Sequence, residues 1–114
     1  MATLSTHVLD ICTGEPARGI RIELHAVQGA DRRHLTTIVT NADGRSGEPR
    51  FPIEPGVYEL TFHAGDYLRT RGQRLDAIPF LDQIVVRFGV DDATRHYHVP
   101  LLLGPYGYST YRGS

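Results

Sequence analysis

The sequence has one cysteine, no tryptophan, no lysine and no long apolar run. Because Cys12 is the only cysteine of the chain, the fold has to be stable without an internal disulfide. No stretch approaches the roughly 20 apolar residues that a membrane-spanning helix needs. The first residues also lack the basic start and apolar core of a secretory signal. We therefore expect a cytoplasmic protein that makes no contact with a membrane.

A surplus of charge of one sign is also missing. The 12 basic and 13 acidic residues leave a formal net charge of −1. Proteins that bind nucleic acid usually carry a concentrated basic surplus, so we expect no nucleic-acid partner. At 114 residues, with 40% hydrophobic and 22% charged residues, the chain has the size and composition of one globular domain. That domain is expected to span residues 1–114.

Short runs in which apolar and polar residues alternate dominate the sequence, and this alternation is typical of half-buried strands. The clearest runs cover residues 20–26, 58–64 and 84–90. Weaker or two-sided patterns predict further strands at 3–10, 33–40, 95–103 and 106–112. Segments rich in Gly, Pro, Asn and Asp separate these runs and are expected to turn. Many short strands with regular turns predict an all-β sandwich or barrel.

Two places depart from the strand pattern. Residues 66–72 begin with Asp66 as a capping residue, continue with good helix formers and end on Gly72. They predict one short helix of about two turns. The second place is Pro100, inside the predicted strand 95–103. Because proline has no backbone N–H to donate, it favours an edge strand or a locally irregular pairing.

Strand 95–103 carries apolar residues on both of its faces, with Leu101 on one face and Leu102 on the other. In a sandwich only one face of a strand packs on the core, so the second face is expected to meet another subunit. By the same alternation, this second face also carries His96 and His98. The pattern therefore predicts a site at an interface between subunits.

The residue types alone leave the role of these histidines open. His96 and His98 point the same way and could form half of a zinc site, although no third ligand stands nearby in the sequence. They could also be hydrogen-bonded or surface residues, or act as acid and base, since histidine titrates near neutral pH. His7 lies on the first predicted strand, and Arg45 follows the turn 41–44. Such an arginine is usually only solvated, but it could bind a planar ligand rich in carbonyl groups.

Three motifs in this order resemble those of the 5-hydroxyisourate hydrolases, also called transthyretin-related proteins. They lie at residues 6–10, at 40–45 and from 96 to the end of the chain, which closes on Tyr-Arg-Gly-Ser. The closing tetrapeptide is the most specific of them, and the resemblance covers essentially the whole chain. One departure is Gly104, at a turn position where the family commonly has serine.

The resemblance implies a transthyretin-like β-sandwich of two four-stranded sheets with one short helix, assembled as a homotetramer that is a dimer of dimers. It implies hydrolysis of 5-hydroxyisourate to 2-oxo-4-hydroxy-4-carboxy-5-ureidoimidazoline in urate breakdown, with no metal or other cofactor. The residues it assigns to catalysis are His7, Arg45 and His98, and those it assigns to substrate binding are Tyr111, Arg112, Gly113 and Ser114. The two histidines would activate water and transfer protons, and either could be the base. Arg45 and Arg112 would bind the substrate and its oxyanion.

A competing expectation is a transthyretin-like carrier of small hydrophobic ligands, which would share the fold. A carrier should have a wider and more apolar channel. The channel expected here is lined by two histidines, two arginines and Tyr111, so it suits a polar purine better than a hydrophobic ligand.

Overall fold

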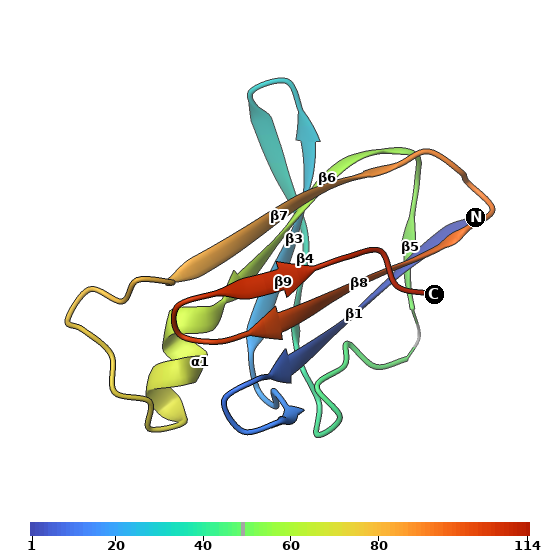
Figure 1. Cartoon of the computed structure of the whole chain (residues 1–114). Helices are drawn as coiled ribbons and strands as arrows, with labels where there is room; N and C mark the ends of the chain where they lie inside the picture. The colour runs from blue at the N-terminus through green and yellow to red at the C-terminus, as the bar shows by residue number, and fades with distance from the viewer. Residues whose placement is uncertain (49) are drawn as a thin grey trace.

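The computed structural model describes residues 1–48 and 50–114, and most of this chain is in β-strands (Figure 1). In chain order the elements are β1 (Ala2–Asp10), β2 (Glu15–Pro16), β3 (Arg21–Gln28), β4 (Asp31–Val39), β5 (Phe51–Ile53), β6 (Gly56–His63), α1 (Ala64–Thr70), β7 (Gln83–Val90), β8 (His96–Leu103) and β9 (Tyr108–Thr110). Within the described residues, no helix is long and apolar enough to cross a membrane.

The strands form two sheets, which confirms the predicted β-sandwich. One sheet has the order β4-β3-β6-β7, with the four strands expected. The other has the order β2-β1-β8-β9 and gains a fifth strand, because β5 also pairs with β1. Strands β1 and β8 run parallel and in register along their length. The first and last motifs of the sequence therefore lie side by side in the structure.

The core lies between the two sheets and follows the alternation predicted from the sequence. Along β1, residues alternate strictly between buried and half-buried, with Leu4 and Val8 among the buried ones. On β8, Val99 and Leu101 point into the core and are almost inaccessible. The opposite face of this sheet carries the remaining residues of the same two strands, among them Ser5, His7 and His98.

Helix α1 begins two residues earlier than predicted. Ala64, which the alternating run 58–64 placed in a strand, is the first helical residue, and Asp66 lies in the first turn. The residue at the cap is His63, whose side chain makes no capping hydrogen bond. Ala64 and Tyr67 are buried, so packing of this face sets the start of the helix in place of a polar cap. The predicted end is confirmed, with Gly72 following the helix at a φ of 83°.

Pro100 lies inside the sheet, so its predicted edge position is wrong and the irregular pairing is right. Its strand β8 stands between β1 and β9. The ladder to β9 stops at the pair of Leu101 with Thr110 and resumes, in the same register, at the bridge between His98 and Gly113. Thr110 Oγ1 donates to the carbonyl of Pro100 at 2.8 Å. The gap in the ladder thus falls where a backbone N–H is missing.

Candidate active site

The candidate site lies on the outer face of the β2-β1-β8-β9 sheet, where β1 and β8 run side by side. Ser5 stands opposite His98, and His7 stands opposite Pro100. Because paired residues of neighbouring strands point to the same face, the side chains of Ser5, His7 and His98 share the outer face. All three residues are half-buried in the isolated chain. The predicted face of His98, opposite to the core residues of β8, is confirmed.

Arg45 is brought to this face by a tight turn whose residues hold it against β1. The side chain of Asn41 accepts the backbone N–H of Arg45 at 3.1 Å. Gly44 has a φ of 72°, and a Cβ there would stand 2.5 Å from the carbonyl oxygen of Val8, so only glycine fits. Arg45 then forms an antiparallel bridge with His7. The turn therefore places a guanidinium beside the first of the two predicted histidines.

Four side chains on this face form a continuous series of hydrogen bonds. Thr3 Oγ1 lies 2.6 Å from His96 Nδ1, and His96 Nε2 lies 2.8 Å from Ser5 Oγ. Ser5 Oγ in turn lies 2.8 Å from His98 Nδ1. The two imidazole rings are nearly parallel, at 23°, with their centres 6.5 Å apart. None of these hydrogen bonds uses Nε2 of His98, so that nitrogen is the one available to a substrate or a water.

The same hydrogen bonds bear on the zinc-site interpretation of the histidine pair. Both ring nitrogens of His96 are engaged by the hydroxyls of Thr3 and Ser5, which leaves neither free as a ligand. Among the described residues, no three His, Cys, Asp or Glu side chains are placed to hold one metal ion. These side chains therefore do not fit a zinc centre of the usual four-ligand kind.

The electrostatics of the site favour neutral histidines. Burial lowers the pKa of His98, and the positive or titratable side chains of Arg45, His7, His96 and Arg50 lower it further. The pKa of His7 is also lowered, by burial first and then by Arg45. A histidine with a lowered pKa is unprotonated near pH 7 and is able to accept a proton. The site thus combines two neutral bases with the fixed positive charges of Arg45 and Arg50.

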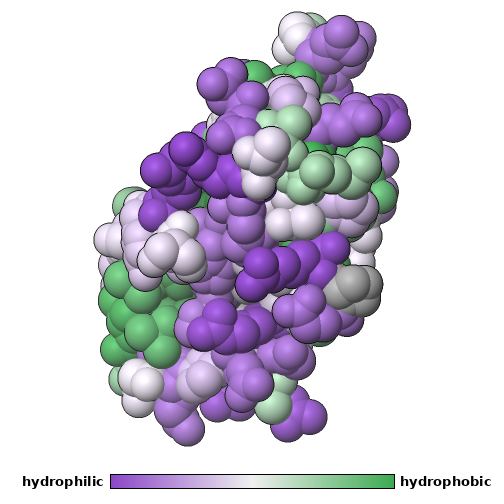
Figure 2. Space-filling view, turned by 90° about the vertical axis from the view of Figure 1, so that its right-hand side faces the viewer, coloured by the Kyte–Doolittle hydropathy of each residue, from purple (hydrophilic) through white to green (hydrophobic). Residues whose placement is uncertain are grey.

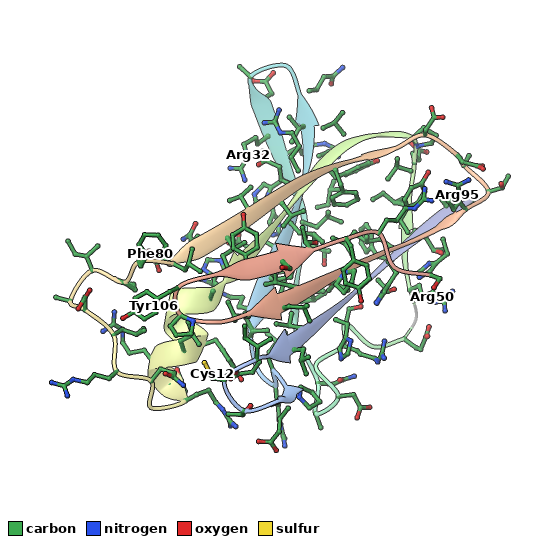
Figure 3. All side chains as sticks on the ribbon, viewed as in Figure 1. Cys12, Arg32, Arg50, Phe80, Arg95 and Tyr106 are labelled. Carbon is green, nitrogen blue, oxygen red and sulfur yellow. The ribbon has the colours of Figure 1, made fainter. Side chains whose placement is uncertain are left out.

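A hollow of about 320 Å³ adjoins these groups and contains residues that the sequence analysis missed. Its lining includes Ser5, Arg45, Glu48 and Arg50. Figure 3 shows Arg50 at the end of the molecule where the C-terminus also lies. Ser5 could have been found, because it stands two residues before His7 and therefore on the same face of the strand. No pattern in the sequence around Arg50 marks it.

The C-terminal tail divides between two places. Gly113 packs against the ring of His98 and donates its backbone N–H to the His98 carbonyl at 2.8 Å. Tyr111 and Arg112 instead line a separate hollow of about 260 Å³ between β7 and β8. Ser114 is exposed. Within one chain, the structure therefore brings Gly113 to His98 and leaves Tyr111 and Arg112 in a different hollow.

Both ends of the chain and Arg50 lie at one end of the molecule. The face turned toward the viewer in Figure 2 is the right-hand side of Figure 1, where the N- and C-termini lie. Hydrophilic residues cover most of it.

The fold and the site together define a transthyretin-like β-sandwich with histidines and an arginine on the outer face of one sheet. The sequence model of the HIUase/Transthyretin family matches residues 4–113. The chain belongs to this family.

Relatives and solved structures agree with this assignment. The chain is similar to the 5-hydroxyisourate hydrolase of Pseudomonas aeruginosa, at 54% identity over 117 residues that cover 100% of this chain and 93% of that protein. A structure of Klebsiella pneumoniae 5-hydroxyisourate hydrolase matches with a TM-score of 0.81 and 38% identity, covering 98% of this chain and 99% of that one.

Two further structures show how widely the fold is used. A crystal structure of (S)-allantoin synthase matches with a TM-score of 0.92 and 41% identity over 99% of this chain, which spans only 44% of that longer chain. Sea bream transthyretin, solved in complex with thyroxine, matches with a TM-score of 0.86 and 26% identity, covering 97% of this chain and 94% of that one. The same sandwich thus occurs in proteins with different names, so the function has to be argued from the residues of the site.

Proposed function

We propose that this chain is an enzyme that hydrolyses 5-hydroxyisourate to 2-oxo-4-hydroxy-4-carboxy-5-ureidoimidazoline in urate breakdown, without a metal or other cofactor. The observation that carries the proposal is the grouping of His7, Arg45 and His98 on the outer face of the β1–β8 pair. Relatives named 5-hydroxyisourate hydrolase, such as that of Pseudomonas aeruginosa at 54% identity, support the choice of substrate.

The reaction opens a cyclic amide, and each of the three side chains meets one of its needs. His98 takes a proton from water through Nε2, and its lowered pKa keeps that nitrogen unprotonated at neutral pH. The resulting hydroxide adds to the ring carbonyl, whose oxygen becomes negative. Arg45 neutralises that oxyanion. His7, next to Arg45, orients the water and assists proton transfer to the ring nitrogen that leaves.

The same proposal assigns substrate binding to the residues of the tail, Tyr111, Arg112, Gly113 and Ser114. Gly113 already contacts the site within one chain, through the ring of His98. Tyr111 and Arg112 line the hollow beside β7, so in our proposal they reach an active site completed by another subunit.

We propose a homotetramer, built as a dimer of dimers, with the outer face of the β1–β8 pair toward a neighbouring subunit. Pro100 is buried and Leu102 half-buried on this face, next to His98. Tyr108 and Tyr111 are large side chains that are 45% and 59% exposed at and just after the edge strand β9. In this proposal residues 1–114 act as one domain of the assembly, in the cytoplasm.

A carrier of hydrophobic ligands is the competing function, because sea bream transthyretin was solved in complex with thyroxine. The side chains on the corresponding face distinguish the two. His7, Arg45 and Nε2 of His98 would have to be desolvated against an apolar ligand that offers them no hydrogen bond, which is costly. A purine with several carbonyl and N–H groups would satisfy them.

The test uses urate freshly oxidised by uricase, whose 5-hydroxyisourate absorbs in the ultraviolet and decays slowly by itself. Adding the protein should accelerate the decay catalytically, and the rate should be the same after exhaustive treatment with a chelator. Decay at the spontaneous rate would contradict the proposed activity. Activity that is lost on chelation and restored by zinc would contradict the metal-free mechanism.

A further inference from the structure

We propose that the hydrogen-bonded series Thr3–His96–Ser5–His98 is a proton relay, in which Ser5 passes to His96 the proton that His98 removes from water. The inference rests on the proposed hydrolysis and assigns that reaction two further residues. Neither Ser5 nor His96 needs to touch the substrate. Both act through His98 and are positioning residues.

The geometry of the series permits transfer in either direction. Thr3 Oγ1 lies 2.6 Å from His96, and His96 lies 2.8 Å from Ser5 Oγ. Ser5 Oγ lies 2.8 Å from His98. A serine hydroxyl both donates and accepts, and each imidazole does the same through its two nitrogens. All donors can therefore point toward Thr3 or all toward His98. In the first arrangement Nε2 of His98 carries a lone pair, and in the second it carries a proton.

The surrounding charges favour a positive charge on His96 over one on His98. His98 faces Arg45, His7 and Arg50, all of which oppose an added proton. Burial lowers the pKa of His96 as well, and Arg50 lowers it further, but His96 also faces the carboxylate of Glu48, which favours the protonated form and has no counterpart at His98. His96 is therefore the better place to hold the proton while the hydroxide attacks.

The steps of the relay balance. Water gives one proton to His98 Nε2, and the proton on His98 Nδ1 moves to Ser5 Oγ as the serine gives its own proton to His96 Nε2. His96 becomes an imidazolium, and the hydroxide forms a C–O bond at the ring carbonyl. When the C–N bond breaks, the same three groups transfer a proton in reverse, and His98 Nε2 delivers it to the leaving nitrogen. No proton is gained or lost overall.

Removal of one hydroxyl tests the relay. Ser5→Ala should lower kcat by about 10- to 100-fold and leave KM within about twofold, because the substrate contacts remain. Ser5→Thr keeps a hydroxyl on a strand that tolerates β-branched residues, and it should restore most of the rate. The matched control is Thr37→Ala on the other sheet, which removes a hydroxyl 2.7 Å from His34 Nε2 and should leave kcat unchanged.

Two further measurements separate a relay from simple support of the fold. In mixtures of H2O and D2O, the dependence of kcat on deuterium content should be curved for the wild type, since several protons move together, and linear for Ser5→Ala. Imidazole 15N spectra of the wild-type protein should show His96 taking up a proton at higher pH than His98.

The outcomes separate the relay from the proposed activity. If the wild-type protein does not hydrolyse 5-hydroxyisourate, the proposed function is contradicted. The order in which His96 and His98 take up protons can still be measured, because the NMR titration needs no turnover. Full kcat in Ser5→Ala overturns the relay, as does protonation of His98 before His96.

Discussion

Gly113 lies so close to His98 that a methyl group on it would stand 2.6 Å from Cδ2 of the imidazole ring. The backbone of Gly113 is also bound to His98, through an N–H···O=C hydrogen bond of 2.8 Å. The tail therefore fixes the position of the ring from one side, while Ser5 fixes it from the other.

Gly113→Ala should lower turnover steeply while leaving the fold intact. Because the tail is held to the His98 carbonyl, the new methyl group has to displace the ring and its hydrogen bond to Ser5. A misplacement of about 1 Å at a catalytic group can cost about 100-fold in rate. Gly107→Ala is the matched control, since a Cβ at Gly107 meets no atom within 4 Å. Equal kcat values for the two variants would contradict a positioning role for Gly113.

His98→Asn should remove most of the catalytic rate. Asparagine keeps a polar side chain of similar reach but cannot accept a proton near pH 7, and a general base typically contributes about 100-fold or more. The ultraviolet assay should show this loss at unchanged sedimentation behaviour. His34→Asn on the opposite sheet is exposed and should retain the wild-type rate. A His98→Asn protein that kept most of its activity would remove this residue from the mechanism.

The alternation of apolar and polar residues along single strands explains why so much of the fold and of the site could be predicted. It placed the core residues of β8 and put His98 on the opposite face, and both placements agree with the structure. It failed at Ala64, where the strand ends and burial of the helix face takes over. Period alone cannot tell the last residue of a strand from the first buried residue of a helix.

Contacts between distant segments could not be predicted in the same way. The parallel pairing that sets Ser5 opposite His98 depends on which strands become neighbours, and single-strand periodicity does not encode that choice. Arg50 lines the hollow beside the site, and no periodicity in the sequence around it indicates this. The edge prediction for Pro100 was wrong because a proline can also sit inside a sheet where the neighbouring ladder is interrupted.

The pH profile should show an acid limb below the ordinary histidine pKa of 6.5. Burial and Arg45 lower the pKa values of both His7 and His98, so the neutral, active forms persist below pH 6.5. The rate should thus be nearly constant from neutral pH down to 6.5 and fall on further acidification. Arg45→Gln removes one of the positive charges and should move the acid limb to higher pH, besides lowering kcat. A limb that stays in place would contradict the electrostatic role of Arg45.

Tyr67→Phe should destabilise the fold without touching the site. Asp10 is 1% exposed and accepts hydrogen bonds from the Tyr67 hydroxyl at 3.0 Å and from the backbone N–H of Cys12 at 2.9 Å. Burial, together with Asp10, raises the pKa of Tyr67 to about 12, so the phenol remains a donor at working pH. Removing it leaves one carboxylate oxygen unpartnered and should cost about 1–3 kcal/mol of unfolding free energy. Urea unfolding measures this cost, and unchanged stability would contradict the anchoring of α1 to β1 by this bond.

The proposed assembly can be tested by a change that an isolated chain tolerates and an interface does not. Leu102 is half-buried in the single chain, on the same face as His98. Leu102→Glu should leave the monomer fold intact, because the carboxylate can reach water. Buried between subunits, the same carboxylate would be unpaired, at a cost of several kcal/mol, so the tetramer should fall to dimers. Activity should fall with it if the site needs residues from a second subunit.

Deletion of residues 111–114 should separate assembly from chemistry. It removes the tail groups assigned to substrate binding, but the apolar residues of the His98 face, such as Leu102, remain. Sedimentation should therefore still show a tetramer, whereas the ultraviolet assay should show a steep loss of turnover. A fully active Leu102→Glu dimer would contradict a site completed between subunits. A fully active tail deletion would show that Tyr-Arg-Gly-Ser marks the family without serving its chemistry in this chain.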